Sequence, residues 1–532
     1  MKRSKLIVIG LVAAFLLTIC AAFAADPVLP SEKDTALTTI ANVERTATVT
    51  AYRVIEPVYG EYGLVKYQPV PGANFANMEA PTQAEVLKLA TEARKGTFAD
   101  KVTYKNITGT DSFSADLPAG SWLVLVTDVT DAEYVYNPML VSAYYTDAND
   151  ADSLTAGTID ADGDFTIGGN VYYAKRSHIF LEKTIETANR KNAKYDDYAI
   201  GDTADFQINT MIPLYDEVYR AMPDALVFYL VDTQSKGLDT ATDFVVEYSV
   251  DGKAWEAVKA ADYVRKNAID AATLEYDGSV TLPQENIEDS LPFDMNKVKS
   301  GNDWMIIFTP KFVADNAGSY IRVSYKAKVN EDAVLAPIAN PNDVELVFTN
   351  DVYHHFSHLQ DTVLVYTFTI NQMVKIDEAG NLLSGAEFAL IKAGSSQTFD
   401  KPYKTCVTDK DGRLYFEGLD DGVYQIQETK APEGHFLNAS VYTVTITPEY
   451  DAAVKKMSSY IITITDGTGK AVSKIPATGT PTEELTKVIN PTLSKLPSTG
   501  GLGTKQFTLI GLLIVLFGAG IFVLVNIKRN RA

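Results

Sequence analysis

The sequence predicts an all-β protein of tandem β-sandwich domains, with one helix in the N-terminal domain and a transmembrane helix near the C-terminus. The chain of 532 residues has 29 Tyr and 23 Phe but only 2 Cys, a composition typical of β-structure without disulfides. Short apolar or alternating runs recur between Gly, Asn and Asp clusters, as in sandwiches. A long apolar run before a basic end predicts the membrane span.

The N-terminal segment 1–24 has the features of a signal peptide. Three cationic residues precede the apolar run Leu6–Cys20, and a small-x-small pattern ends at Ala24. We therefore expect cleavage between Ala24 and Ala25; an uncleaved anchor helix is the alternative. Cys20 would be removed, and Cys406 is expected to be a small strand side chain rather than a reactive thiol.

The first domain is expected over 25–175. Thr and apolar residues alternate over Thr46–Ala51, which indicates a half-buried strand. The continuous apolar run Trp122–Val126 is typical of a strand buried on both faces. Pro81–Lys95 breaks the strand pattern, because its apolar residues recur at helical spacing. The sequence predicts one helix there.

Two further domains follow, at 176–352 and 363–490. Strand-like runs separated by turn residues predict a sandwich in the first of them: Phe206–Met211, Leu226–Val231, Phe244–Val250, Trp304–Phe308 and Tyr320–Val329. Similar runs predict a sandwich in the second: Val363–Ile370, Glu387–Ile391, Arg413–Phe416, Gly422–Glu428 and Val441–Ile446.

The C-terminus has three parts in order. Residues 491–506 form a linker that contains a pentapeptide, 507–527 are long enough to cross a bilayer, and the basic tail 528–532 should stay cytoplasmic. This tail resembles the cell-wall sorting signals read by sortases, rather than a simple tail anchor. The resemblance implies cleavage between Thr499 and Gly500 and transfer of the Thr499 carboxyl to an amine. The pentapeptide consists of Leu496, Pro497, Ser498, Thr499 and Gly500.

The strongest internal motif lies in the third domain. Tyr424–His435 (YQIQETKAPEGH) resembles the E-box of Cna-B-type, Ig-like domains, and Val374–Leu390 and Val488–Asn490 resemble the first and last strands of that fold. In this family a lysine and an asparagine condense into an isopeptide bond with help from the E-box glutamate. The resemblance implies Lys375, Asn490 and Glu428 in these roles. Burial would keep the amine neutral and the acid protonated, as the reaction requires.

The second domain resembles the fimbrial isopeptide D2 domain. The similarity rests on Leu181–Ile185, Ile200–Asp202, Asp232–Leu238 and Phe348–Asp351, in that order. It implies a bond between Lys183 and Asn350 with Asp232 as the assisting acid. Glu247 remains an alternative acid, because it could also point inward from its strand.

The segment Asn170–Lys175 (NVYYAK) resembles the lysine motif of sortase-assembled pilus backbones, although the usual proline is Ala174 and no tryptophan precedes it at the right spacing. The resemblance implies that Lys175 accepts Thr499 of the next subunit. The sequence is thus similar to Gram-positive major pilins. A wall-anchored adhesin or minor pilin that does not polymerise is the alternative.

The net charge of −21 argues against nucleic-acid binding. No enzyme constellation stands out, so we expect a structural protein whose only chemistry is single-turnover bond formation, without cofactors. The implied partners are pilin-class and housekeeping sortases, other copies of the chain, minor pilins and peptidoglycan; host ligands stay open. Two groups of residues could in principle bind a metal, but we expect them to be solvated loops and turns instead. They are the histidines 354, 355 and 358, and the Asp-rich stretches 147–152 and 160–164.

Overall fold

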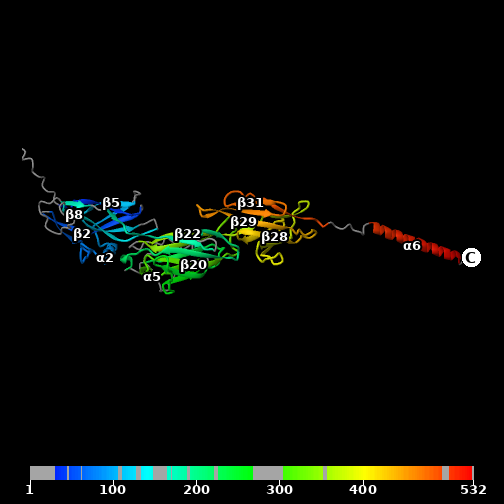
Figure 1. The fold of residues 1–532 in the computed structure, drawn as a ribbon, viewed down its shortest axis with the longest axis horizontal. Coiled ribbons are helices and arrows are strands. Elements are labelled where there is room, and N and C mark those ends of the chain that lie inside the picture. Colours follow the sequence, from blue (N-terminus) through cyan, green and yellow to red (C-terminus); the bar gives the residue numbers. More distant parts are fainter. Residues whose placement is uncertain are drawn as a thin grey trace, which may run out of the picture. The chain divides into compact units, whose positions relative to one another are not determined.

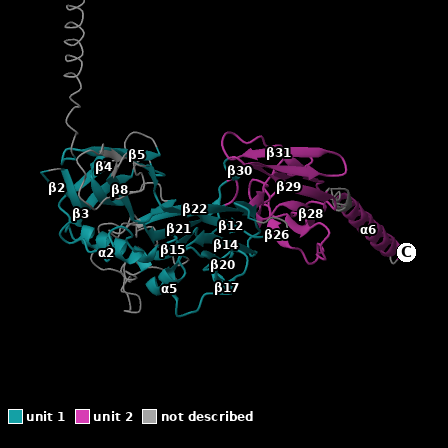
Figure 2. Cartoon of the chain, turned by 60° about the vertical axis from the view of Figure 1, so that its left-hand side comes forward, with its two compact units in different colours: residues 1–334, 338–367, 454–456 teal, residues 335–337, 368–453, 457–532 magenta. Residues whose placement is uncertain are grey.

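The computed structural model describes residues 30–529 except 45–46, 62, 106–110, 128–132, 148–164, 169–170, 188–191, 221–225, 268–302, 351–355 and 494–501. Two compact units make up the chain (Figure 2). Unit 1 comprises Met1–Val334, Ile338–Thr367 and Val454–Lys456, and unit 2 comprises Leu335–Pro337, Phe368–Ala453 and Met457–Ala532.

The first domain of unit 1 is built from three sheets (blue to cyan in Figure 1). Their orders are β10-β1-β5, β11-β7 and β3-β2-β6-β8-β9, with β4 also pairing with β2. The strands are β1 (Thr35–Ala41), β2 (Thr48–Gly60), β3 (Gly63–Pro69), β4 (Lys101–Lys105), β5 (Ser112–Pro118), β6 (Gly120–Thr127), β7 (Tyr134–Tyr136), β8 (Met139–Asp147), β9 (Phe165–Gly168), β10 (Val171–Tyr173) and β11 (Arg176–His178).

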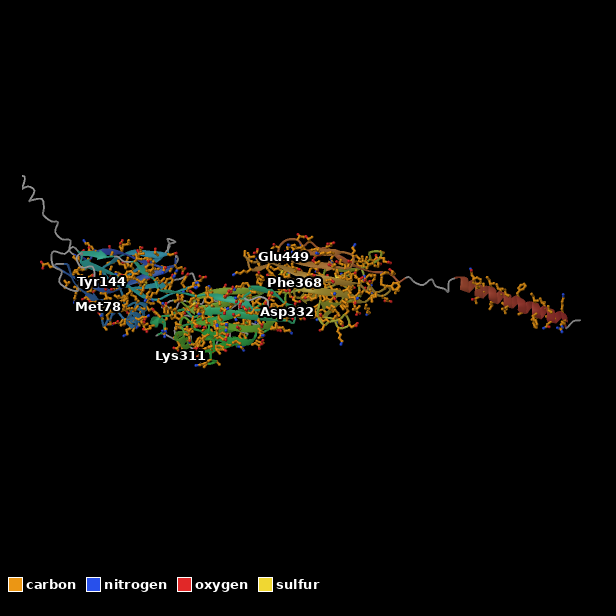
Figure 3. All side chains as sticks on the ribbon, viewed as in Figure 1. Met78, Tyr144, Lys311, Asp332, Phe368 and Glu449 are labelled. Carbon is orange, nitrogen blue, oxygen red and sulfur yellow. The ribbon has the colours of Figure 1, made fainter. Side chains whose placement is uncertain are left out.

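The predicted helix is α2 (Gln83–Arg94). It begins with a capping box, in which the Thr82 hydroxyl accepts from the Glu85 backbone N–H and the Glu85 carboxylate accepts from the Thr82 N–H. Its buried face includes Leu89 and Ala93. The expected all-apolar strand is also present, because every residue of β6 is buried. On β8, the ring of Tyr144 (labelled in Figure 3) meets Tyr67 edge to face at a centroid distance of 4.7 Å.

The second domain of unit 1 is a sandwich of two sheets, with the orders β12-β14-β20-β16-β17 and β13-β22-β21-β15-β19-β18. Its helices are α3 (Glu217–Arg220) and α5 (Pro310–Asp315). Its strands are β12 (Leu181–Ile185), β13 (Tyr195–Asp197), β14 (Thr203–Met211), β15 (Phe228–Gln234), β16 (Thr242–Ser249), β17 (Glu256–Ala257), β18 (Tyr263–Asn267), β19 (Trp304–Phe308), β20 (Tyr320–Lys328), β21 (Asn340–Thr349) and β22 (Phe356–Tyr366).

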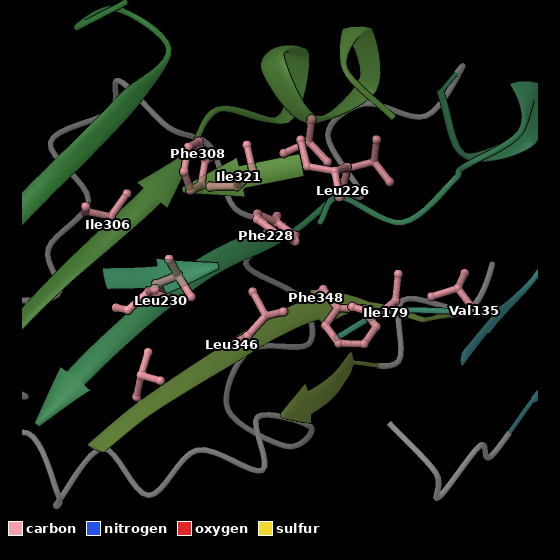
Figure 4. Packing of buried hydrophobic residues seen from close by; sticks show 14 of the residues in the cluster. Val135, Ile179, Leu226, Phe228, Leu230, Ile306, Phe308, Ile321, Leu346 and Phe348 are labelled. Carbon is pink, nitrogen blue, oxygen red and sulfur yellow. The ribbon is translucent and has the colours of Figure 1, made fainter. Parts of the chain in front are cut away.

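Alternation along the strands creates the core of this sandwich. In β14 the even-numbered residues Ala204 to Thr210 are buried, and the odd-numbered ones are exposed or half-buried. Phe228 and Leu230 on β15 and Phe348 on β21 pack between the sheets (Figure 4). A pocket closed in this way excludes water from any polar side chain that points into it.

The second domain extends further than the sequence indicated. The sequence predicts boundaries at 352 and 363, but β21 pairs with β22 along the whole of β21, from Thr349↔Phe356 to Asn340↔Val365. This ladder places Val363–Tyr366 in the second domain. The sequence pattern does not show this boundary, because Val363–Ile370 is one apolar run. In the structure β22 and β23 divide that run between the two units.

Unit 2 contains the third domain, with sheets ordered β23-β27, β24-β32 and β26-β25-β28-β29-β30-β31. Strand β24, near the start of the domain, and the last strand, β32, lie parallel and adjacent, with Lys375 opposite Val488. The strands are β23 (Phe368–Ile370), β24 (Met373–Asp377), β25 (Glu387–Lys392), β26 (Lys404–Val407), β27 (Phe416–Leu419), β28 (Gly422–Lys430), β29 (Val441–Asp451), β30 (Lys456–Thr465), β31 (Lys470–Pro476) and β32 (Thr486–Asn490).

The C-terminal helix α6 (Leu502–Arg529) contains an apolar segment, Gln506–Arg529, whose most apolar stretch of 18 residues has a mean hydropathy of 2.8. Its 24 residues are long and apolar enough to cross a bilayer. The prediction of an all-β protein with one N-terminal-domain helix and one C-terminal apolar helix is confirmed; the short helices α3 and α5 were not expected.

Candidate functional site

A fully buried lysine lies inside the second domain. Lys183 is on β12 and is 0% exposed. Its Nζ contacts the Asp232 carboxylate, donates to Asn342 Oδ1 at 2.6 Å and donates to the Asp343 carbonyl at 3.1 Å. A buried ammonium without partners would be very costly, so these contacts define a built polar site in an apolar sandwich.

The asparagine beside Lys183 is Asn342, and the expected pairing with Asn350 is wrong in this structure. Asn342 sits near the start of β21, while Asn350 follows its end, eight residues further along or about 26 Å at strand rise. The Asn350 amide instead donates to Ser357 Oγ at 2.6 Å. Asn350 was expected because Phe348–Asp351, at the end of the strand, resembles the D2 domain. The asparagine that contacts Lys183 belongs instead to Asn340–Asp343 (NPND), at the start of the same strand.

The expected acid is in place. Asp232 lies on β15, is 0% exposed and touches Lys183. The alternative, Glu247, does not face this site: it forms an ion pair of 2.7 Å with Arg322, and both side chains are partly exposed. The structure therefore favours Asp232 on geometry.

A tyrosine that the sequence did not single out completes the site. The Tyr325 hydroxyl donates to Asp232 Oδ2 at 2.9 Å and accepts from Asn342 Nδ2 at 2.8 Å. Lys183 and Tyr325 come from one sheet, and Asp232 and Asn342 come from the other. The four side chains thus form a closed ring of contacts across the sandwich.

Burial sets the protonation of this ring. Removal from water lowers the pKa of Lys183, against the opposing charge of Asp232. Burial raises the pKa of Asp232 to about 6, although Lys183 and Tyr325 oppose that change. Both shifts favour a neutral amine beside a neutral carboxylic acid. A neutral amine is the nucleophilic form of lysine.

An ion pair holds the backbone of Lys183. The Asp361 carboxylate accepts from the Lys183 N–H at 2.6 Å, and the Lys194 ammonium donates to the Lys183 carbonyl at 2.6 Å. Lys194 and Asp361 also contact each other. Because β12 is the edge strand of its sheet, these contacts satisfy the Lys183 backbone on the side that does not face β14, while its side chain reaches into the sandwich.

Unit 2 holds a second site, built from the three residues that the sequence predicted. Lys375 and Asn490 are 0% exposed and Glu428 is 2% exposed. The Asn490 amide donates to Glu428 Oε1 at 2.7 Å, and Lys375 Nζ lies 3.8 Å from Glu428 Oε2. Lys375 also donates to the Val488 carbonyl at 3.0 Å. The structure therefore brings Lys375, Glu428 and Asn490 together.

The lysine of the second site is also less readily charged than a lysine in water. Burial lowers the pKa of Lys375 to about 8, and the nearby Glu428 opposes this shift. Among the described residues, Asn490 Oδ1 is buried without a hydrogen-bond partner. The Asn438 N–H donates to Glu428 Oε2 at 2.9 Å, and the Asn438 side chain donates to the Ile489 carbonyl at 3.0 Å. Asn438 thereby links the acid to the last strand.

Other predicted positions have simpler surroundings. Lys175 is exposed and follows β10, and its carbonyl accepts from the Asn137 N–H at 2.8 Å. Cys406 is partly buried, and this burial raises the pKa of its thiol to about 12, which disfavours a thiolate. His358 lies 2.8 Å from the Glu345 carboxylate. The cleavage site Ala24–Ala25, the pentapeptide Leu496–Gly500, His354 and His355 lie outside the described residues.

Two family models match parts of the chain: the T6 antigen Ig-like domain over residues 33–175 and the SpaA prealbumin-like fold domain over residues 370–460. A search of curated proteins finds the trypsin-resistant surface T6 protein of Streptococcus pyogenes, 26% identical, with 94% of this chain and 96% of that protein covered. The solved T6 backbone pilin has a TM-score of 0.59 at 19% identity, covering 87% of this chain and 100% of the other. The chain has the fold of a backbone pilin.

A further solved structure, the full-length major pilin SpaD of Corynebacterium diphtheriae, is 16% identical with a TM-score of 0.47, covering 87% of this chain and 99% of that chain. The T6 structure is described as a modular three-domain backbone pilin. The three sets of sheets in this chain match that three-domain organisation.

Proposed function

We propose that this protein is the structural backbone subunit of a sortase-assembled cell-surface pilus. The observation that carries the proposal is the presence of two buried sites, each of which brings a lysine, a carboxyl group and an asparagine together. We further propose that each site forms an intramolecular isopeptide bond, Lys183–Asn342 in unit 1 and Lys375–Asn490 in unit 2. The protein is not an enzyme beyond these single turnovers.

The reaction at each site needs no outside reagent. The neutral lysine Nζ attacks the asparagine Cγ, a C–N bond forms, and the bond from Cγ to Nδ2 breaks. Nζ loses one proton and Nδ2 gains one, so ammonia leaves and nothing is oxidised or reduced. The buried acid carries the proton between the two nitrogens, and the fold supplies a high effective molarity by holding the amine and the amide beside the same acid.

The bonds suit a load-bearing protein. Lys183 and Asn342 are separated by 159 positions and lie on opposite sheets, so a bond ties the sheets together. Lys375 lies on β24, near the start of the third domain, and Asn490 ends its last strand, β32. By analogy with disulfides, closing a loop of this size stabilises a fold by about 5 kcal/mol. A covalent tie also resists forces that would separate hydrogen-bonded strands.

Polymerisation would use the two other predicted positions. Thr499 of one subunit, released from the sorting pentapeptide by a pilin-class sortase, would be joined to the Lys175 amine of the next. Lys175 is exposed on a described part of unit 1, as an acceptor must be. A head-to-tail contact of this kind does not close on itself and so produces an open fibre. The housekeeping sortase would attach the base of the fibre to peptidoglycan.

The proposal is tested by electrophoresis of cell-wall extracts in detergent. We expect a ladder of high-mass species that boiling does not dissociate, and we expect Lys175→Ala to abolish it. A matched control is Lys236→Ala, another lysine on unit 1. A wild-type strain without a ladder would overturn the backbone role and leave a wall-anchored adhesin or minor pilin as the better description.

A further inference from the structure

The two buried sites place the acid differently with respect to the amide. In unit 2 the Glu428 carboxylate accepts directly from Asn490 Nδ2 at 2.7 Å. In unit 1 the acid is aspartate, whose side chain is one methylene shorter. The Tyr325 hydroxyl lies between Asp232 and the Asn342 amide: it donates to Asp232 at 2.9 Å and accepts from Asn342 Nδ2 at 2.8 Å.

We propose that Tyr325 is a catalytic residue of the unit 1 site, where its hydroxyl relays a proton from Asp232 to the leaving nitrogen of Asn342. The proposal rests on the proposed Lys183–Asn342 bond. Aspartate and tyrosine together would do in unit 1 what glutamate does alone in unit 2. Tyr325 touches the reacting amide through Nδ2, the atom that must be protonated before it can leave as ammonia.

The relay balances. Lys183 Nζ attacks Asn342 Cγ and gives up a proton to the Asp232 carboxyl. Once Cγ is tetrahedral, the Nδ2 lone pair is free to accept, and both hydrogen bonds of the Tyr325 hydroxyl reverse. Asp232 then passes its acidic proton to the Tyr325 oxygen while the hydroxyl proton moves to Nδ2. The Cγ–Nδ2 bond breaks and ammonia leaves, so Asp232 and Tyr325 end in their starting forms. Burial raises the pKa of Tyr325 well above its ordinary value, so a concerted transfer is favoured over a free phenolate.

Packing holds the hydroxyl in this position. Tyr325 is 1% exposed. Its ring stacks on Phe206 and Phe244 at centroid distances of 5.2 and 5.5 Å and meets Trp304 edge to face at 5.0 Å. Phenylalanine fits the same aromatic cage, so Tyr325→Phe removes the oxygen and leaves these ring contacts in place.

The test compares Tyr325→Phe with Tyr215→Phe in the full chain. Tyr215 is a matched control, because it is also 1% exposed in unit 1 and its hydroxyl also makes a buried hydrogen bond, to the Thr349 carbonyl at 2.7 Å. Samples are taken at intervals after cell-free synthesis. The cross-linked peptide that contains Lys183 and Asn342 is measured by mass spectrometry, with the Lys375–Asn490 peptide of the same molecule as an internal reference.

We expect Tyr325→Phe to slow the unit 1 reaction by about a hundredfold or more, the range of general acid–base catalysis, without slowing unit 2. Tyr215→Phe should react like the wild type. The double variant Asp232→Glu with Tyr325→Phe should recover much of the rate, because the longer acid can reach Nδ2 directly. A purely structural role for Tyr325 predicts no such rescue.

Equal rates in Tyr325→Phe and Tyr215→Phe would overturn the relay, whether both are fast or both are slow. Slow reaction in the double variant would also count against it. If the wild type yields no Lys183–Asn342 peptide, the proposed bond and the relay both fail. A wild-type bond with an unaffected Tyr325→Phe variant overturns the relay alone.

Discussion

Lys183 and Asn342 meet inside the second domain, with Nζ 2.6 Å from the amide oxygen, although 159 positions separate them in the chain. One comes from the first strand of the sandwich and the other from β21, on the opposite sheet. This contact changes the expected cross-link and makes the role of each asparagine in the segment testable.

Replacing Asn342 by alanine should prevent the unit 1 bond, whereas Asn350→Ala should not. Losing a tie worth about 5 kcal/mol should lower the melting temperature of this domain by roughly 10–20 °C, measured by calorimetry. Asn350 is a fair control because it is buried and hydrogen-bonded as well. If Asn350→Ala left Lys183 unlinked and Asn342→Ala did not, the assignment would be contradicted.

In unit 2, Glu428→Gln should leave Lys375 and Asn490 unlinked, because the amide cannot shuttle protons as a carboxyl group does. The intact mass of the chain should then be higher by about the mass of one ammonia than that of the wild type. Glu387→Gln is the control, since Glu387 lies on the neighbouring strand and pairs at the surface with Lys430. A fully linked Glu428→Gln protein would show that the acid is dispensable.

The Asn490→Ala variant keeps Lys375 as a free buried amine, so its stability should depend on pH. The folded pKa of about 8 lies below the ordinary 10.5, so the unfolded chain binds more protons between these values. The free energy of unfolding of unit 2 should therefore rise as pH increases through this window. Denaturant titrations at several pH values check the sign, and Asn490→Ala with Lys375→Met should remove the dependence.

The ion pair that holds the Lys183 backbone should matter for the rate of bond formation. Lys194→Met removes the donor to the Lys183 carbonyl, and we expect the unit 1 bond to form roughly tenfold or more slowly, since small misplacements of reacting groups are costly. Lys326→Met removes the surface partner of Asp205 in the same domain and should change nothing. Exchanging the pair, as Lys194→Asp with Asp361→Lys, should not restore the rate, because neither backbone contact can form.

The sequence predicted the fold class and most of unit 2 because local patterns carry that information. Glu428 lies in a contiguous motif and Asn490 ends the last strand, so the resemblance to Cna-B-type domains implied Lys375, Glu428 and Asn490 without a structure. Unit 1 differs, since Asn340, Asn342 and Asn350 all flank or begin one strand. Only the contact between Lys183 Nζ and Asn342 Oδ1, which depends on strand pairing across the two sheets, shows which asparagine reaches the lysine.

Tyr325 could not be found from the sequence for a similar reason. Its strand alternates as any sandwich strand does, and nothing in the pattern distinguishes a catalytic hydroxyl from a core aromatic residue. Its relation to Asp232 and Asn342 depends on three strands from two sheets. The end of the second domain was missed because strand pairing, not composition, separates β22 from β23.

The most direct test of the account is a peptide map of the purified wild-type protein by mass spectrometry. We expect two cross-linked peptides, one joining Lys183 to Asn342 and one joining Lys375 to Asn490, and an intact mass lower by two ammonias than the sequence of the processed chain requires. An intact mass without this loss, with all four residues recovered in linear peptides, would contradict the claim that these buried pairs are the covalent ties of a pilus subunit.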